Sequence, residues 1–260
     1  MIGKTRDNPI FVEPRRGLKI SECQFYHTMD LPKVGTVSAP DGKWDLRSHV
    51  ESIFAGYEFE GQSVVEIGPA SGFLTFEMEK RGAQVVAVDA APDHEWDIVP
   101  FPGLREMWGP ASRLGWRAIT NGWWFAHEKM RSKARASYIG GHNARPEILG
   151  KYDVALVANV LLHNRDPLRI LTNAADMAPT VIVVEQYHQE LEAVGLPVAQ
   201  FRPDPNAKKG QENWNGWWNF STKYFENYLR VMGCTVFELT NYTLFWGELP
   251  IPYFTLVASK

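Results

Sequence analysis

Two carboxylates and two glycines that lie close together in the chain could bind a nucleotide-like ligand. An apolar run that contains Glu66 leads into a turn with Gly68 and Gly72, and a second apolar run ends at Asp89. This pattern is typical of a strand-loop-helix-strand unit that binds nucleotides. Glycine lets the backbone pass close to a ligand, and a carboxylate after the second strand can accept hydrogen bonds from both hydroxyls of a ribose.

The spacing of these residues distinguishes two classes of ligand. Dinucleotide sites usually read G-x-G-x-x-G and direct a helix N-terminus at a pyrophosphate. This chain reads E-x-G-x-x-x-G, with Ala70 where a middle glycine is common. Glu66 would repel a phosphate, but it suits a cationic amino-acid group such as the methionine end of S-adenosylmethionine (SAM). The pattern therefore favours SAM over a dinucleotide and over an ordinary strand-turn-helix corner.

Four motifs resemble those of the class I SAM-dependent methyltransferases, and in particular a bacterial subgroup related to the tRNA wobble-uridine carboxymethyltransferases. They are G-F-x-x-F-E-x-E-x-R-G-A at residues 72–83, Y-H-x-x-D-L at 26–31, K-W-D at 43–45 and V-L-x-H-x-R-x-P at 160–167. The resemblance covers residues 24–258 and implies a seven-stranded sheet whose last strand is antiparallel. It says little about the methyl acceptor.

Composition is that of an ordinary globular protein, with 45% hydrophobic and 22% charged residues in 260. No apolar run is long enough to span a membrane, and the N-terminus lacks a signal-peptide core. Cys23 and Cys234 form no disulfide or metal pattern, which favours a cytoplasmic location and no bound metal. The net charge of −3 does not indicate a nucleic-acid partner, and the oligomeric state is left open.

Strand and helix patterns alternate along the chain, which predicts an α/β fold: a Rossmann-like, mostly parallel sheet with helices on both faces. We expect an N-terminal cap over residues 1–60 and a SAM-binding domain over 61–260, with a lid inserted at about 186–220. Strands are predicted at 63–67, 84–88, 135–139, 153–158, 180–185, 235–239 and 254–258. Helices are predicted at 46–54, 72–81, 121–132, 167–177 and 221–232.

Ligands of such sheets bind beyond the carboxyl ends of the strands, where the strand order reverses. Asn143 and Ala144 lie where the family resemblance places the adenine edge, although Asn143 could simply be a turn residue. Lys43 belongs to the K-W-D motif. The predicted cofactor-binding residues are Lys43, Glu66, Gly68, Ala70, Gly72, Phe73, Asp89, Ala90, Asn143, Ala144, Ala158 and Asn159.

Two histidines are candidates for a catalytic base. His163 follows the fourth strand, and His27 lies in the cap. A histidine can take a hydroxyl proton near neutral pH, although either residue could instead only hold a loop. Aromatic and polar residues around them could bind the acceptor, since acceptor pockets are largely aromatic, or could plug the cap onto the core. These candidates are Tyr26, Glu185, Tyr187, His188, Trp214, Trp217 and Trp218.

A basic segment between Arg105 and Arg135 admits two interpretations. It holds five arginines and two lysines against two glutamates. A solvated helix face accounts for this composition, and an anionic acceptor or RNA phosphate is the alternative.

These observations predict a SAM-dependent methyltransferase that methylates a small molecule, with oxygen favoured and nitrogen and carbon left open, and releases S-adenosyl-L-homocysteine. The alternatives are a tRNA-modifying (carboxy)methyltransferase and a SAM-binding module without catalysis. In the carboxymethyl relatives, a tyrosine at the position of Leu162 and an arginine at that of Tyr253 contact the extra carboxylate of carboxy-SAM. Their absence here predicts plain SAM, because a carboxylate buried beside Leu162 would be poorly paired.

Overall fold

A seven-stranded sheet forms the centre of the chain. The computed structural model describes residues 10–39, 44–91, 97–99, 109–203 and 216–260. The strand order is β10-β11-β7-β6-β3-β4-β5, in which β11 runs antiparallel to both neighbours and β3 to β7 are parallel. The mostly parallel Rossmann-like sheet and its antiparallel last strand are therefore confirmed. The strands are β3 (Ser63–Ile67), β4 (Gln84–Val88), β5 (Arg135–Ser137), β6 (Val154–Ala158), β7 (Thr180–Gln186), β10 (Val236–Trp246) and β11 (Leu249–Ser259).

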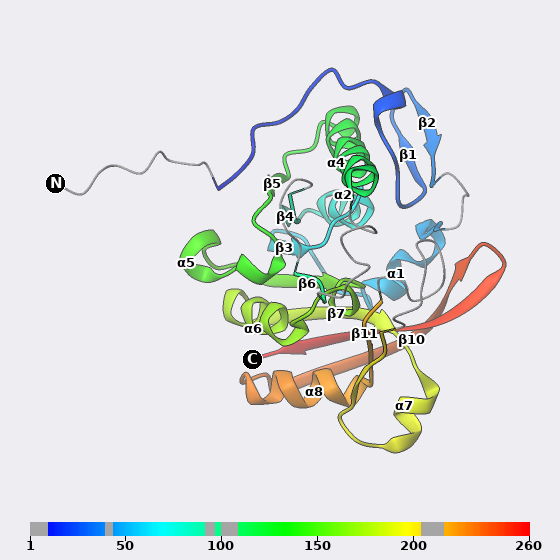
Figure 1. Ribbon diagram of the computed structural model, residues 1–260. Helices are drawn as coiled ribbons and strands as arrows, with labels where there is room; N and C mark the ends of the chain where they lie inside the picture. The colour runs from blue at the N-terminus through cyan, green and yellow to red at the C-terminus, as the bar shows by residue number, and fades with distance from the viewer. Residues whose placement is uncertain (1–9, 40–43, 92–96, 100–108, 204–215) are drawn as a thin grey trace.

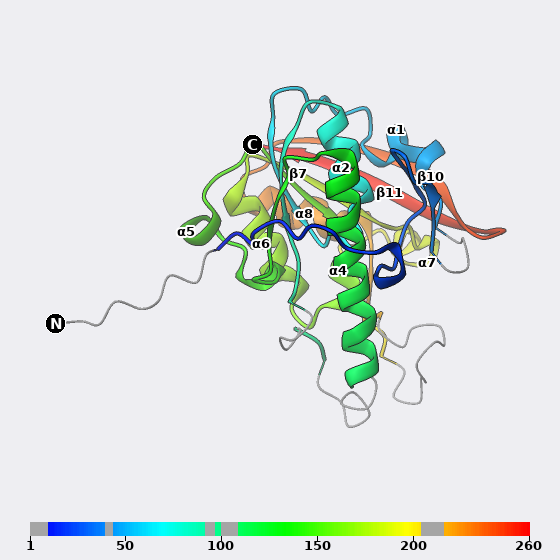
Figure 2. The ribbon, with the colours of Figure 1, turned by 90° about the horizontal axis from the view of Figure 1, so that it is seen from above.

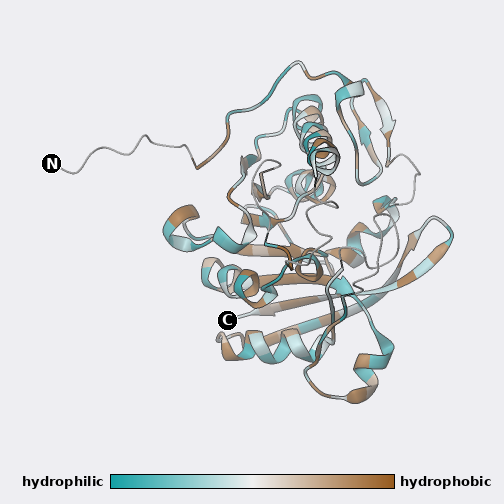
Figure 3. Ribbon diagram, viewed as in Figure 1, coloured by the Kyte–Doolittle hydropathy of each residue, from teal (hydrophilic) through white to brown (hydrophobic). Residues whose placement is uncertain are grey.

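Helices cover both faces of this sheet (Figure 1). Helices α2 (Phe73–Lys80) and α4 (Pro110–Met130) lie on one face. On the other face lie α5 (Pro146–Leu149), α6 (Pro167–Met177) and α8 (Thr222–Val231). The central strands are apolar on both faces for this reason, and Figure 3 shows hydrophobic colour concentrated along them.

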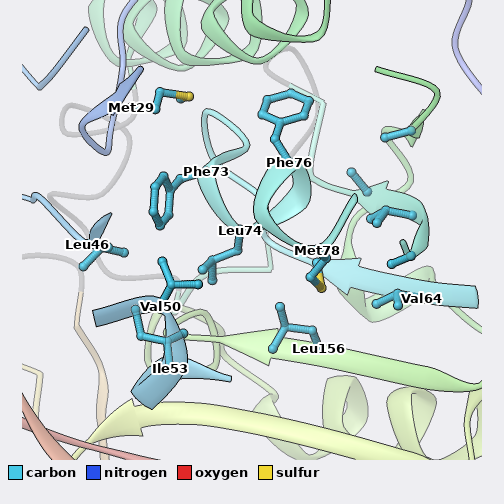
Figure 4. Close-up of a cluster of buried hydrophobic side chains, with 14 of the residues drawn as sticks. Met29, Leu46, Val50, Ile53, Val64, Phe73, Leu74, Phe76, Met78 and Leu156 are labelled. Atoms are coloured by element: carbon cyan, nitrogen blue, oxygen red, sulfur yellow. The ribbon is translucent and has the colours of Figure 1, made fainter. Parts of the chain in front are cut away.

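The N-terminal segment packs onto the face that α2 covers. It contains η1 (Ile20–Glu22), β1 (Met29–Leu31), β2 (Gly35–Val37), η2 (Arg47–His49) and α1 (Val50–Ile53). Figure 4 shows its side chains Leu46 and Ile53 lying close to Phe73 and Leu74 of α2. These residues belong to one buried cluster, so the segment is fixed against the helix that follows the glycine turn.

The described part of residues 187–220 lies beside the sheet. They include α7 (Gln189–Val194) and a two-stranded antiparallel pair, β8 (Ala199–Phe201) and β9 (Trp218–Phe220). Two short 3₁₀ turns, η3 (Gly141–Asn143) and η4 (Leu161–His163), follow β5 and β6. None of the helices in the described ranges is long and apolar enough to cross a membrane.

Three elements are longer than the sequence pattern predicts. Helix α4 starts at Pro110, which suits a first helical turn, rather than near residue 121. Strands β10 and β11 form a hairpin that extends far beyond the predicted ranges 235–239 and 254–258. Pro250 and Pro252 obscured this extension, because proline normally argues against a strand. Here β11 has no β7 partner before Tyr253, so no sheet hydrogen bond is needed on that side.

Ser221 joins the inserted segment to α8. Its side chain caps the helix by accepting from the Tyr224 N–H at 3.3 Å, and it also accepts from the Val198 N–H at 2.9 Å. We expect Ser221→Ala to lower the free energy of unfolding by about 2–3 kcal/mol, since a cap and a buried partner are lost together. The cap-only control Asp166→Ala should cost about 1 kcal/mol. Equal losses of stability in Ser221→Ala and Asp166→Ala, measured by urea titration, would contradict the additional role of Ser221 in holding Val198.

Candidate functional site

A cleft of about 460 Å³ opens at the carboxyl ends of the parallel strands. Gly68 follows β3, Asp89 follows β4 and Asn159 follows β6, and all three line it. This is the position at which open α/β sheets bind ligands. Of the residues predicted from the sequence, the cleft brings together Tyr26, His27, Gly68, Ala70, Asp89, Ala90, Ala158, Asn159, His163 and Trp217.

The backbone around the cleft adopts unusual conformations. Gly68 has φ +80°, and the non-glycine residues Ala70 and Asn159 have φ +50° and +49°. Such left-handed conformations cost roughly 1–3 kcal/mol outside glycine and tend to gather at functional sites. A Cβ at Gly68 would lie 2.7 Å from Cγ2 of Val160, so the turns after β3 and β6 touch directly.

Asp89 faces the cleft from the end of β4. Its Oδ1 accepts a hydrogen bond from the Ala90 N–H at 2.7 Å, which fixes the side chain. The surrounding protein raises the pKa of Asp89 to about 7, because burial disfavours the charged form. The carboxyl is therefore placed where a ligand with hydroxyl groups would favour its ionised form.

Glu66 faces a smaller inner pocket of about 60 Å³ that shares Tyr26, His27, Gly68, Ala158 and Asn159 with the cleft. Its carboxyl accepts a hydrogen bond from the Thr75 hydroxyl, which in turn accepts from Trp123 Nε1 at 3.3 Å. Burial raises the pKa of Glu66 to about 8. A buried acid without a cation beside it favours its neutral form, and a cationic ligand would reverse this preference.

Both candidate histidines line the cleft. His27 lies edge-to-face with the Tyr26 ring at 4.9 Å, and among the described residues its buried Nδ1 has no hydrogen-bond partner. Burial lowers the pKa of His27 to about 4, so the ring is neutral near pH 7. His163 ends η4, and its N–H donates to the Val160 carbonyl at 3.2 Å.

The described walls of the cleft carry two carboxylates and three histidines but no lysine or arginine. Asp89 and Asp97 line the cleft, and no lysine or arginine does so in the described ranges. Arg113 and Arg117 on α4 are exposed and lie outside its lining. In the part of the chain that the structure covers, no three His, Cys, Asp or Glu side chains gather as a metal site would require.

Comparison with protein families identifies the chain. Residues 45–237 match the family model described as a methyltransferase domain. The chain belongs to this methyltransferase family. No protein with a curated description matches it.

The solved structures that this methyltransferase resembles share its fold. The N-terminal domain of EvdMO1 in the presence of SAH and D-fucose is 14% identical, covers 90% of this chain and 91% of that chain, and has a TM-score of 0.55. The same domain with SAH bound is 15% identical, with 81% and 80% covered and a TM-score of 0.54. A SAM-dependent methyltransferase from Mesorhizobium loti is 12% identical, with 83% and 100% covered and a TM-score of 0.50.

Several predicted cofactor residues of the methyltransferase lie away from the cleft. Gly72 turns the chain into α2, with no room for a Cβ against Phe76 and Trp123, and Phe73 lies on the far side of that turn. Asn143 Nδ2 donates to the Ile139 carbonyl at 3.0 Å, and Ala144 is fully buried in the core. Because the η3 turn directs Asn143 back to its own loop, Gly140, Gly141 and His142 line the cleft instead.

Most of the predicted acceptor residues are also placed elsewhere. Trp218 Nε1 donates to the Asn164 carbonyl at 2.9 Å and so holds a loop, while Trp217 lines the cleft. Tyr187 and His188 follow β7 but do not line the cleft, and His188 Nδ1 lies 3.7 Å from Glu190 Oε1. Glu185 is only 2% exposed and lies beneath the cleft rather than in its wall. Lys43 and Trp214 lie outside the described residues.

Sequence reasoning missed several residues that line the cleft. Helix α4 contributes Ser112, Gly115, Trp116 and Ile119, and the extended start of this helix is visible in Figure 2. Pro110 was the signal that could have located them, since proline is common in a first helical turn. The other lining residues that were missed include Gln24, Asp97, Ile98 and Asn164.

The raised carboxyl pKa values predict how stability depends on pH. Because burial raises the pKa of Glu66 from about 4.5 to about 8, the folded ligand-free protein holds a proton that the unfolded chain releases. Stability should fall as pH rises through this window, by up to about 1.4 kcal/mol per pH unit for each such proton. Denaturant titrations at a series of pH values should show that the free energy of unfolding of Glu66→Gln falls less steeply with pH than that of the wild-type protein. The exposed control Glu58→Gln should keep the wild-type dependence of this free energy on pH. An unchanged dependence in Glu66→Gln would refute the raised pKa of Glu66.

Proposed function

We propose that this methyltransferase transfers the methyl group of SAM to an uncharged small molecule, at oxygen, and releases S-adenosyl-L-homocysteine. The observation that carries the proposal is the pairing of Asp89 and Glu66 on either side of the Gly68 turn, in a chain of the methyltransferase-domain family. Asp89 would accept the ribose hydroxyls, and Glu66 would pair with the cationic amino-acid end. Residues Gly140–His142 line the cleft and would form a wall against the adenine base of SAM.

Catalysis in such a site is mainly alignment of two reactants. Bound SAM would supply an electrophilic methyl group. His27 is the residue best placed to meet the acceptor hydroxyl, because its buried Nδ1 has no partner among the described residues. The low pKa of His27 keeps the ring neutral and able to accept a hydrogen bond, although it makes the ring a weak base. His163 is the second candidate. It follows the Gly68 turn in the sequence, whereas His27 precedes it, and both residues line the same cleft.

The lining of the cleft favours an uncharged acceptor with an aromatic or apolar surface. Trp116, Trp217 and Tyr26 supply aromatic walls. Of the two carboxylates in the described lining, Asp97 already pairs with Arg165 at 2.8 Å, so no unpaired cation in this lining would meet an anionic acceptor. RNA would need lysine or arginine at its phosphates. Arg113 and Arg117 are exposed and lie outside the described lining of the cleft, as a solvated helix face requires.

The inner pocket favours plain SAM over carboxy-SAM. The Tyr253 hydroxyl lines it and donates to Asn159 Oδ1 at 3.3 Å, so this hydroxyl already has a partner. A second carboxylate there would lie in the same pocket as Glu66 without an arginine in the described lining, which costs several kcal/mol. The Leu162 side chain does not line either pocket.

The cofactor assignment predicts a specific loss of binding. Asp89→Ala should weaken SAM binding by about 1.5–3 kcal/mol, the scale of hydrogen bonds to a charged group. Isothermal titration calorimetry measures this, with Asp176→Ala on the outer surface of α6 as the control that keeps wild-type affinity. Carboxy-SAM should compete poorly in the same assay. Unchanged SAM affinity in folded Asp89→Ala, or tighter binding of carboxy-SAM, would overturn the assignment.

The acceptor class is tested by product formation. Release of S-adenosylhomocysteine should occur with neutral phenols and alcohols and not with their phosphate esters or with tRNA. With a consumed acceptor, His27→Ala should lower kcat by about 10²-fold or more while SAM affinity holds. His49→Ala, which lies outside both pockets, serves as the control. Turnover of phosphorylated acceptors alone would reject the uncharged class, and tight SAM binding with no turnover would favour a non-catalytic module.

A further inference from the structure

Thr75 carries a buried hydroxyl that lies behind the inner pocket. It belongs to α2, is 0% exposed, and lines neither the cleft nor the inner pocket. Burying a hydroxyl costs free energy unless the group is hydrogen-bonded. The partners of this hydroxyl therefore indicate what it does.

Two hydrogen bonds join Thr75 to residues of two other elements. Trp123 of α4 donates its Nε1 hydrogen to the hydroxyl oxygen at 3.3 Å, and the hydroxyl donates to Oε2 of Glu66 in β3. An indole N–H only donates and an ionised carboxylate only accepts. With Glu66 ionised, the Thr75 hydroxyl must therefore accept from Trp123 and donate to Glu66.

The indole of Trp123 is fixed in place by its surroundings. It is 2% exposed, its ring stacks on His127 at a centroid distance of 5.1 Å, and it lies 5.6 Å from the ring of Phe76. A Cβ at Gly72 would lie 2.6 Å from Cδ1 of this indole. Gly72 therefore leaves the space that Trp123 occupies, although it does not line the cleft itself.

The two carboxyl oxygens of Glu66 have different surroundings. Oε2 accepts from Thr75, whereas no hydrogen bond joins Oε1 to another described residue. Glu66 lines the inner pocket, where a ligand can reach it. A hydrogen bond donated to a carboxylate favours its ionised form. Thr75 thus lowers the pKa of Glu66, while burial and the charge of Asp89 raise it.

No other titratable group that lines the described part of the inner pocket is charged near pH 7. These groups are Tyr26, His27 and Tyr253. Burial raises the pKa of both tyrosines and lowers that of the histidine to about 4. A cationic ligand in this pocket would therefore meet one carboxylate, and Thr75 is the residue that orients it.

We propose that Thr75 is a positioning residue, which holds Oε2 of Glu66 and leaves Oε1 to meet the cationic amino-acid end of SAM. Trp123 fixes Thr75 in turn. Helix α4 therefore lines the cleft with its first turns and supports the acid of the inner pocket from a later turn. The effect on SAM rests on the proposed function, whereas the action of Thr75 on Glu66 does not.

Ligand binding tests the positioning with two ligands. Thr75→Val removes the hydroxyl and keeps the shape of the side chain. Its affinity for S-adenosylhomocysteine at pH 7, measured by calorimetry, should fall about tenfold or more, the scale of a hydrogen bond to a charged group. 5′-Methylthioadenosine, a thioether without the amino-acid end, should bind as it does to the wild-type protein. Thr75→Ser keeps the hydroxyl and should restore the affinity for S-adenosylhomocysteine.

The pH dependence of stability tests the action on Glu66 without any ligand. The free energy of unfolding of the wild-type protein should fall with rising pH until Glu66 ionises, because burial raises the pKa of Glu66 to about 8. Without the Thr75 hydroxyl the ionised form loses a donor. In Thr75→Val this fall should therefore extend about one pH unit higher or more.

A second variant and a matched control complete the experiment. Trp123→Phe removes the indole N–H and keeps an aromatic ring, so it should cause smaller changes of the same sign, and it provides the test if Thr75→Val does not fold. Thr255→Val removes another fully buried hydroxyl, which donates to the Ile53 carbonyl at 2.9 Å and lines neither pocket. It should lower stability but keep the wild-type ligand affinities and pH dependence.

Three results would overturn the inference: an unchanged pH dependence of unfolding in both Thr75→Val and Trp123→Phe, equal losses of affinity for the two ligands in Thr75→Val, or failure of Thr75→Ser to restore the affinity for S-adenosylhomocysteine. If the wild-type protein binds neither SAM nor S-adenosylhomocysteine, the proposed function fails. The unfolding measurements then still decide whether Thr75 acts on Glu66.

Discussion

The close approach of two turns determines the shape of the whole site. The turn after β3 and the turn after β6 meet at Gly68 and Val160, with no space for a Cβ between them. Because β3 and β6 are neighbours in a parallel sheet, both turns leave the same edge and must share one opening. Glycine at this point satisfies both the positive φ and the contact. Everything that lines the cleft is placed relative to this contact.

Around that contact lie three carboxyl groups whose pKa values are raised by burial. Burial raises the pKa of Asp89 to about 7 and those of Glu66 and Glu185 to about 8. These groups fall into two kinds. Glu66 and Asp89 line pockets, so a cationic ligand with hydroxyls can reach them and favour ionisation. Glu185 lines neither pocket and is only 2% exposed, and its Oε1 has no hydrogen-bond partner among the described residues. A ligand that binds the folded protein through such groups stabilises the fold.

The sequence predicted the central sheet well and placed Gly68 and Asp89 at the cleft, because local patterns determine both, while the cofactor-binding role of these residues stays a prediction. A buried parallel strand followed by glycine or a carboxylate is visible within about ten residues, as at Asp89. The placement of Asn143 could not be read in this way. Whether Asn143 or His142 faces the cleft depends on one 3₁₀ turn, which shifts side chains by a single position. The role of Trp218 was equally hidden, since its partner is the carbonyl of Asn164 in a distant loop.

The part of the cleft that the N-terminal and inserted segments line is assembled by contacts between segments far apart in the chain, which is why sequence patterns describe it poorly. The N-terminal segment is bound to the turn between β3 and α2 by the Tyr26 N–H, which donates to Ser71 Oγ at 2.9 Å. It is bound to α4 by the Gln24 N–H, which donates to the Ala118 carbonyl at 2.8 Å. The inserted segment is tied by the Trp217 N–H, which donates to the Leu162 carbonyl at 2.8 Å. Backbone bonds of this kind place a segment without dictating its side chains. These parts of the cleft wall are therefore placed by long-range backbone contacts, which local sequence patterns do not reveal.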